Sequence, residues 1–248
     1  MSETNENISL LNKHNKIWNE KLLLRKIYRD FYILIKQNLV LNNTGKIVEL
    51  GSGIGKIKEI IPECICTDQH DSSYIDGMEN AYNLSYQDNS ISNLILFDVF
   101  HHLKYPGDAL KEFNRVLMES GRLLIFEPHL SLLGLLVYGF FHPEPLRLNN
   151  KIEWNSASQS LTFDQQYYAA QGNASRIFCW EKCIRIKKNW NALKIIKIPA
   201  ISYVASGGYT GTQLYPSRFF ALMQIIDRLC ACLPRVFATR MLIVLEKK

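Results

Sequence analysis

Two groups of residues in this chain could take part in chemistry, and the first is a glycine-rich turn preceded by a carboxylate. Residues 51–55 read GSGIG, and Glu49 stands just before them. Because glycine has no Cβ, a ligand can approach the backbone closely along such a turn. Glu49 adds a negative charge at the end of a short apolar run, the position at which open α/β sheets bind ligands. The turn is therefore a candidate ligand-binding loop.

The spacing of the glycines excludes two common nucleotide-binding loops. A dinucleotide fingerprint needs G-x-G-x-x-G, but Lys56 stands where the third glycine belongs. A P-loop needs G-x-x-x-x-G-K-[ST], and here Leu50 replaces the first glycine while Ile57 replaces the hydroxyl residue. The pattern that remains is Glu-x-Gly-x-Gly-x-Gly, which an ordinary turn between a strand and a helix can also produce.

The second group consists of imidazoles and carboxylates that could act as general bases. Its members are His101, His102, Glu127, His129 and His142. A neutral imidazole near pH 7 can remove a proton from a hydroxyl group, although the paired histidines could equally have a structural role. Because histidine and glutamate side chains spread over separate loops are weak evidence for metal ligation, we predict no metal site.

These residues need a scaffold, and short apolar runs indicate a sheet. The predicted strands are residues 46–50, 64–67, 94–97, 122–126, 193–201 and 241–245. In a parallel sheet the carboxyl ends of the strands meet at one edge, so residues that follow the strands should lie close together there.

Helical spacing of apolar residues accounts for most of the remaining chain. It predicts helices at residues 17–40, 56–61, 106–119 and 218–237. Residues 1–12 are expected to be frayed, and the stretch between Asp68 and Leu94 is too short for a full helix. We expect the apolar face of residues 218–237 to pack in the core, with a membrane-facing surface as the alternative.

The order of these motifs resembles the class I S-adenosylmethionine-dependent methyltransferases, in particular their small-molecule, methyltransferase type 11-like branch. The segment FDVFHHLKYPGDALKEFNRVLMESGRLLIFEP matches that branch closely, and the resemblance covers residues 46–128. It implies an α/β, Rossmann-like fold with a seven-stranded, mostly parallel sheet. Helices would lie on both faces, the last strand would be antiparallel, and a lid-like insertion would follow the fifth strand.

The resemblance also implies S-adenosylmethionine as cofactor and S-adenosylhomocysteine as product. Asp68 would accept hydrogen bonds from the ribose hydroxyls, with Asp71 as a competing candidate, and Gln69 would lie beside the adenine. Asn80 stands where the family has Asp, but its carbonyl oxygen can still accept from the adenine amino group. The expected cofactor-binding residues are Glu49, Gly51, Ser52, Gly53, Gly55, Asp68, Gln69, Asn80, Ala81, Asp98 and Val99.

We predict a single domain over residues 1–248, in four parts. A helical segment (1–45) precedes the cofactor-binding core (46–128), which is followed by a substrate lid (129–175) and a part that completes the sheet (176–248). A long insertion without strong periodicity is more often functional than idle. Its expected substrate residues are His129, His142, Trp154, Tyr167 and Tyr168, and the expected catalytic residues are His102, His101 and Glu127.

Composition narrows the class of protein. The 248 residues are 47% hydrophobic and 21% charged, which are globular values, and the net charge of +6 suits an anionic substrate, a membrane surface or plain solubility. The six cysteines lack paired C-x-x-C spacing and predict buried free thiols. No signal peptide is evident, and the apolar run at 130–141 is shorter than the ~20 residues of a spanning helix. We expect a cytoplasmic protein, with the inner face of the membrane as an alternative place of action.

Three functions remain open at this point. One is O-methylation of a small-molecule acceptor such as a saccharide or lipid-linked sugar in surface-glycan assembly. Another is methylation of a lipid or quinone-like ring at a membrane, and the third is a non-catalytic module, suggested because Asn80 and Ser92 replace the family's acids. The nucleic-acid signatures of this fold are missing and the basic charge is diffuse, so we predict no nucleic-acid partner. The sequence makes no prediction of the oligomeric state.

Overall fold

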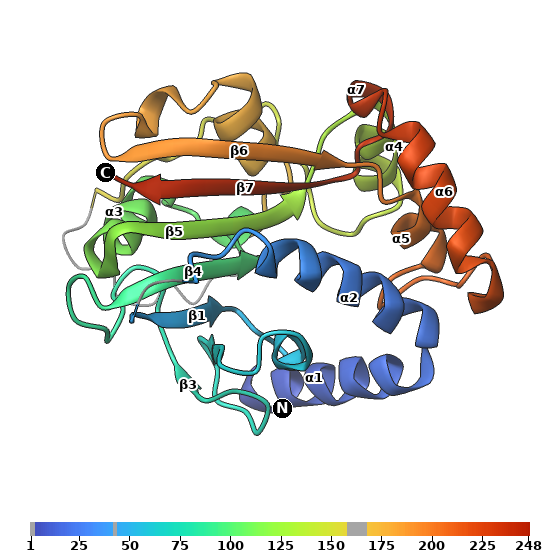
Figure 1. The fold of residues 1–248 in the computed structure, drawn as a ribbon, viewed down its shortest axis with the longest axis horizontal. Helices are drawn as coiled ribbons and strands as arrows, with labels where there is room; N and C mark the ends of the chain where they lie inside the picture. Colours follow the sequence, from blue (N-terminus) through green and yellow to red (C-terminus); the bar gives the residue numbers. More distant parts are fainter. Residues whose placement is uncertain (1–2, 42–43, 158–167) are drawn as a thin grey trace.

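The computed structural model describes residues 3–41, 44–157 and 168–248, and a seven-stranded sheet forms its centre (Figure 1). The strand order is β3-β2-β1-β4-β5-β7-β6. All neighbours are parallel except β7, which runs antiparallel to both β5 and β6. The strands are β1 (Lys46–Leu50), β2 (Ile65–Asp68), β3 (Gly77–Met78), β4 (Ile91–Phe97), β5 (Leu117–Pro128), β6 (Trp190–Ile198) and β7 (Arg240–Lys247). The predicted Rossmann-like fold with an antiparallel last strand is confirmed.

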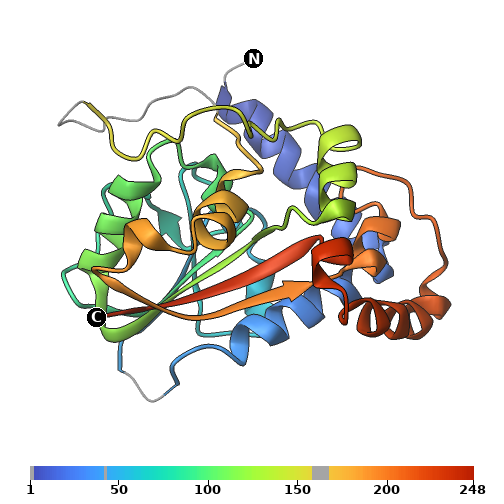
Figure 2. The same ribbon diagram turned by 90° about the horizontal axis from the view of Figure 1, so that it is seen from above.

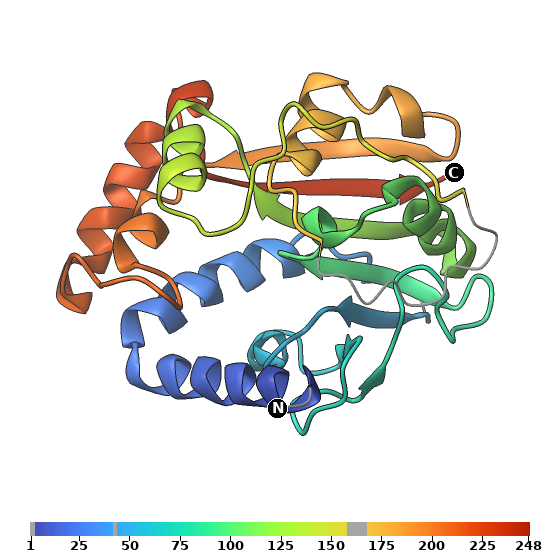
Figure 3. The same cartoon turned by 180° about the vertical axis from the view of Figure 1, so that it is seen from behind.

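Helices cover both faces of this sheet, as Figures 1 and 3 show from opposite sides. They are α1 (Glu3–Glu20), α2 (Leu22–Lys36), α3 (Pro106–Val116), α4 (Leu132–Phe140), α5 (Ile201–Ser206), α6 (Phe220–Cys230) and α7 (Pro234–Phe237). Shorter turns are η1 (Lys56–Glu59), η2 (Phe100–His102), η3 (Ser175–Trp180), η4 (Ile184–Ile186) and η5 (Ser217–Phe219).

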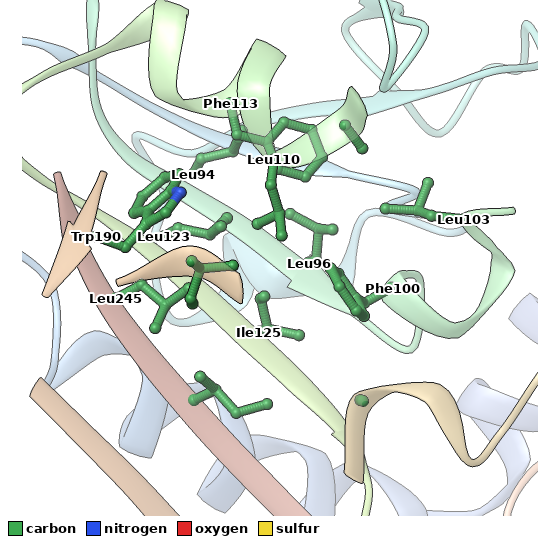
Figure 4. Close-up of a cluster of buried hydrophobic side chains, with 14 of the residues drawn as sticks. Leu94, Leu96, Phe100, Leu103, Leu110, Phe113, Leu123, Ile125, Trp190 and Leu245 are labelled. Carbon is green, nitrogen blue, oxygen red and sulfur yellow. The ribbon is translucent and has the colours of Figure 1, made fainter. Parts of the chain in front are cut away.

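Alternation along the central strands divides the core into two clusters. Leu94 and Leu96 of β4 point to the face covered by α3 and η3, where Phe113 and Phe178 are fully buried (Figure 4 shows part of this cluster). Ile95, between them, points to the face covered by α2. Successive side chains of a strand point to opposite faces. Because both faces of the sheet are covered at β4, every residue of this strand is buried.

Three predictions about helices are wrong. Within the predicted frayed segment 1–12, residues 3–12 are helical, because α1 extends from Glu3 and is held by Trp18, whose Nε1 donates to Glu59 Oε1 at 3.2 Å. Residues 56–61 form only the 3₁₀ turn η1, and α2 packs with Ile57 and Ile61 on that face of the sheet instead. Residues 218–237 break into η5, α6 and α7, and no residue of α6 is buried, so the segment does not form the expected core helix and only Phe220 packs at the margin of the core.

Two other predictions are met in part. The segment between β2 and β4 holds no helix among its residues, as expected, and contributes only the two-residue strand β3. All six cysteines are free thiols, but only Cys64, Cys66 and Cys183 are buried, while Cys232 is exposed. The division into four parts and the function of residues 129–175 as a lid stay predictions.

Phe126 of β5 tests the packing on the α2 face. Its ring is fully buried, stacks on Phe97 with centroids 4.6 Å apart, and lies 4.8 Å from the ring of Phe31. Phe126→Ala should lower the free energy of unfolding by about 3–5 kcal/mol, because it leaves a cavity in a packed core. Urea denaturation measures this loss, and the control Phe140→Ala, at a side chain 79% exposed, should change stability by less than about 0.5 kcal/mol. Equal effects of the two changes would contradict the packing described.

Candidate cofactor site and active site

The glycine-rich turn follows β1 and lies against the end of β4. Gly51 has φ +68°, and a Cβ there would stand 2.3 Å from Cγ2 of Val99, so only glycine fits this approach. Gly53 has φ +55°, but a Cβ there would meet only Cδ2 of Leu11 in α1, 3.9 Å away. The turn is therefore packed tightly at Gly51 and has space beside Gly53, beneath α1.

Asp68, at the end of β2, is hydrogen-bonded to this turn. Its Oδ2 accepts from the backbone N–H of Gly53 at 3.1 Å, and its Oδ1 accepts from the N–H of Gln69 at 2.7 Å. Ser52 is tied to the same strand, because its N–H donates to Thr67 O at 2.9 Å. The carboxylate is half-buried, and each of its oxygens keeps a second lone pair, so hydroxyl donors of a ligand could still bind there.

The two departures from the family pattern have structural explanations. Oδ1 of Asn80 accepts from the N–H of Tyr82 at 3.0 Å, which stabilises the local turn and leaves a second lone pair for a ligand. Ala81, beside it, packs at the margin of the α3-side core cluster. Ser92 is buried, and its hydroxyl donates to the carbonyl of Gly45 at 2.9 Å. A charged Asp could not donate in this way, so the serine suits its buried place.

Glu49 is the other carboxyl group of the glycine-rich turn, and it is buried. Burial raises its pKa to about 8, with the nearby Cys66 thiol and Asp68 carboxylate adding to the shift. Within the described residues, no Lys, Arg or His lies within ion-pair distance of it. A buried carboxyl group without a cation is a place where a positively charged ligand would be stabilised.

At the ends of β4 and β5, His101 and Glu127 form a buried ion pair. Nδ1 of His101 is 2.6 Å from Oε2 of Glu127, and the other oxygen of Glu127 accepts from the N–H of Phe100 at 2.6 Å. On its other side, Nε2 of His101 is 3.2 Å from Oε2 of Glu144. Burial opposes charge on this ring, but the Glu127 carboxylate outweighs it and, with Glu144, raises the pKa of His101 to about 10. The ring is therefore an imidazolium at neutral pH.

His102 differs from its neighbour in charge and exposure. Its Nδ1 lies 2.9 Å from the carbonyl oxygen of Tyr168, and its Nε2 lies 3.8 Å from Oε1 of Glu144. Burial and the positive charge of His101 lower the pKa of His102, so this ring is neutral near pH 7. Because the carbonyl accepts the Nδ1 proton, Nε2 carries the lone pair and can accept a proton.

The predicted substrate residues separate into two sets. Tyr168 and His142 lie at the His102 site, with Nδ1 of His142 4.0 Å from Oε2 of Glu144. His129 directly follows β5 and is buried against Ser175, and burial and the charge of Lys197 lower its pKa to about 4. Trp154 packs over α3, where its carbonyl accepts from the N–H of Gly107 at 2.8 Å. Tyr167 lies outside the described residues.

The sequence did not reveal several residues of this site. Glu144 contacts both paired histidines, and Gln171 lies 3.1 Å from Nε2 of His101, yet both come from the loosely patterned insertion. Arg240 at the start of β7 is buried and pairs with Asp98 at 2.6 Å. A carboxylate in an irregular segment and an arginine before a strand have no local signature, so only the fold shows their positions.

Two clusters in the described residues have the composition of a metal site. They are His101 with His102 and Glu144, and His101 with Asp98 and Glu127. Both depend on His101, whose raised pKa opposes the neutral ring that metal ligation requires. The absence of a metal site stays a prediction.

Comparisons with known proteins agree with this geometry. Residues 48–125 match the model of the type 11 methyltransferase domain family. The fold resembles that of an S-adenosylmethionine-dependent methyltransferase from Thermotoga maritima, described as a possible histamine N-methyltransferase. That match has 16% identity, covers 97% of each chain and has a TM-score of 0.58.

A second similar structure is a methyltransferase from Archaeoglobus fulgidus, with 13% identity, a TM-score of 0.54 and coverage of 90% of this chain and 94% of that one. No curated protein sequence matches the chain. Residues 48–125, which include the glycine-rich turn and most of strands β1 to β5, therefore match a methyltransferase domain, and nearly the whole chain shares the fold of S-adenosylmethionine-dependent methyltransferases.

Proposed function

We propose that this enzyme methylates a hydroxyl group of a small molecule, such as a saccharide or a lipid-linked sugar at the inner face of a membrane. The observation that carries the proposal is the neutral imidazole of His102, whose Nε2 lone pair lies at the carboxyl edge of the sheet beside Glu144. A hydroxyl nucleophile carries a proton that has to leave as its oxygen forms the new bond, and a neutral imidazole can accept it.

The glycine-rich turn, Glu49 and Asp68 fit the cofactor. When bound, S-adenosylmethionine supplies an electrophilic methyl group on a sulfonium, and its methionine end also carries an ammonium group. The buried Glu49 carboxyl group, which lacks a cation among the described residues, suits that positive charge. The space beside Gly53 leaves the backbone accessible, and the second lone pairs of Asp68 can accept from ribose hydroxyls.

The protein's part in the reaction is to orient the acceptor and to take its proton. The hydrogen bond from Nδ1 of His102 to the Tyr168 carbonyl holds the ring in one tautomer. Glu144, 3.8 Å from Nε2, would stabilise the imidazolium that forms when the proton arrives. His101 keeps its own proton, because Glu127 binds it tightly, so we assign His101 and Glu127 to positioning and not to proton removal.

Groups around His102 suit a polar, ring-shaped acceptor. His142 and Tyr168 belong to the insertion after β5, and the guanidinium of Arg147 lies 5.0 Å from the centre of the Tyr168 ring. A sugar could use these donors and acceptors. Methylation of a lipid or quinone-like ring is the second candidate, favoured by the exposed apolar side chains of α4, such as Leu136 and Phe140.

His102→Ala tests the assignment of the base. Turnover should fall by about 10²- to 10⁴-fold while the dissociation constant for S-adenosylmethionine stays unchanged, because the ring acts on the acceptor and not on the cofactor. In the wild type, turnover should decline as pH falls below the lowered pKa of His102.

The assay would use tritiated S-adenosylmethionine with a panel of glycosides, lipid-linked saccharides and phenols, and mass spectrometry would locate the methyl group. His70→Ala, at a histidine in the loop after β2, serves as the matched control. Methyl transfer only to nitrogen or carbon, or wild-type turnover in His102→Ala, would overturn the proposal.

Gly53→Val tests the cofactor loop. The side chain would occupy the space beside the turn, so the stabilisation by S-adenosylhomocysteine should be lost. At 100 times its dissociation constant, the ligand should stabilise the wild type by about 2.7 kcal/mol in thermal unfolding. Gly139→Ala, where the new Cβ would make an ordinary 3.5 Å contact with Leu146, is the matched control and should keep the full shift. An unchanged shift in a folded Gly53→Val protein would refute the loop assignment.

The raised pKa of Glu49 gives the cofactor affinity a pH dependence. The folded protein without ligand holds this proton more tightly than the unfolded chain, so its stability should fall as pH rises from about 4.5 to about 8. A cationic ligand favours the carboxylate, so the affinity for S-adenosylmethionine should rise by up to about tenfold per pH unit below pH 8.

Glu49→Gln should remove both trends, because the amide does not titrate. Calorimetric titration between pH 6 and 9 in two buffers of different ionisation enthalpy would also report the proton released on binding. An equal pH dependence in the wild type and the variant would exclude Glu49 as the group that responds to the cofactor's charge.

A further inference from the structure

We propose that one end of the molecule docks on the surface of an anionic phospholipid bilayer. The proposal starts from α6, in which no residue is buried. Leu222, Ile225 and Leu229 follow the spacing of one helical face and are all exposed, and Leu233 continues this line beyond the helix. The opposite face of α6 contacts the protein only partly, since Met223 and Ile226 are half-buried. An apolar stripe turned to the outside has no role in the core.

A second apolar stripe lies on α4. Leu132, Leu136 and Phe140 recur every four residues, and Phe141 follows them. The side of α4 that carries Gly134 and Tyr138 is buried, so the helix already packs against the protein through that side. Its outer face is therefore not part of the core. Together the two stripes form what we call the apolar end. Its side chains are between 50% and 79% exposed: Leu132, Leu136, Phe140, Phe141, Leu222, Ile225, Leu229 and Leu233.

The two stripes belong to one connected part of the structure. Ser131, which caps α4, donates through its hydroxyl to the carbonyl of Val236 in α7 at 3.0 Å. Tyr138 donates to the carbonyl of Thr239, two residues after the end of α7, at 2.8 Å. In Figures 1 and 2, α4, α6 and α7 all lie at the same end of the molecule, the end toward which the parallel strands point. The helices that carry the two apolar stripes therefore lie at one end of the molecule (Figures 1 and 2).

The charges around the apolar end favour an anionic lipid surface over a protein or a second copy of the chain. Exposed arginines stand at positions 218, 228 and 235, before, within and after the apolar stripe of α6. The single acid of this segment, Asp227, is turned inward, where it accepts from the N–H of Ile201 at 2.7 Å and from the hydroxyl of Ser202 at 2.5 Å. Two copies meeting here would bring like charges together, whereas lipid phosphates would neutralise them.

The geometry indicates binding to the surface of a bilayer and not insertion across it. No helix in the described ranges is long and apolar enough to span a membrane. An amphipathic helix with arginines at its margins lies in the plane of the interface, with its apolar side chains among the acyl chains. α4 begins four residues after Pro128, the end of β5, so the apolar end adjoins the edge that carries Glu127. If the proposed function holds, a lipid-linked acceptor could reach His102 while its tail stays in the bilayer.

Vesicle flotation with the full-length protein tests the docking surface, without acceptor or cofactor, so that it can fail or succeed independently of the proposed function. The probes are vesicles of phosphatidylcholine alone and of phosphatidylcholine with 30% phosphatidylglycerol. The protein should float with the anionic vesicles, and 0.5 M NaCl should weaken this binding. Ile225→Glu and Phe140→Glu should each lower the bound fraction at least tenfold without changing the thermal unfolding temperature, because both side chains are exposed.

Arg228→Gln should weaken binding to the anionic vesicles about fivefold, the equivalent of about 1 kcal/mol per cation at such a surface. Ile184→Glu, on an exposed side chain of η4 beside Arg185, is the matched control and should bind like the wild type.

The proposal is overturned if the protein floats with neither kind of vesicle. It is also overturned if Ile184→Glu abolishes binding while Ile225→Glu preserves it. Analytical ultracentrifugation supplies one more outcome. A dimer that Ile225→Glu and Phe140→Glu both dissociate, with no vesicle binding by the wild type, would assign the apolar end to self-association instead.

Discussion

The carboxylate of Glu127 organises the chemistry at the carboxyl edge of the sheet. It is fully buried at the end of β5, and a buried carboxylate is stable only when donors and a counter-charge satisfy it. The N–H of Phe100 and the ring of His101 supply both. The ion pair thereby fixes the loop after β4 and keeps His101 positively charged, and burial together with that charge lowers the pKa of His102. The two adjacent histidines therefore differ in protonation at neutral pH.

The antiparallel last strand contributes a second buried ion pair to the same edge. Arg240 begins β7, and its guanidinium binds Asp98 at 2.6 Å while lying 4.8 Å from the centre of the Phe126 ring. Asp98 has φ +56°, a conformation that costs energy in a residue with a Cβ and persists only where the surroundings impose it. Asp98 and Val99, which directly follow β4, are therefore held against the glycine-rich turn by Arg240, a residue near the other end of the chain.

These two ion pairs lie at the edge of the sheet where the proposed cofactor site and the proposed acceptor site meet. The glycine-rich turn, Asp68 and Asp98 lie on strand ends whose positions the sheet determines. Glu144, Tyr168 and His142 come from the insertion after β5, which reaches the same edge through contacts with His101 and His102. The apolar end of α4 and α6 adjoins this insertion, so acceptor binding and the proposed contact with lipid concern neighbouring parts of the chain.

The sequence by itself determined most strands of the sheet and the glycine-rich turn, because buried strands and a turn without side chains have local signatures that short segments carry in full. It predicted Glu49 and Asp68 at the cofactor loop and the paired histidines at the strand ends for the same reason. The antiparallel direction of the final strand followed from the resemblance to the family, since a single strand does not reveal its direction in the sheet. The prediction for residues 218–237 failed because tertiary packing determines which way a helix faces. Helical spacing alone does not reveal whether an apolar face lies against the core or on the surface. Nor could the sequence separate His102 from His101 in protonation, or show that His129 and Trp154 lie apart from the contacts around His102. Protonation and position at those residues depend on burial and on charges such as Glu144 and Arg240, which only the tertiary structure brings within a few ångströms.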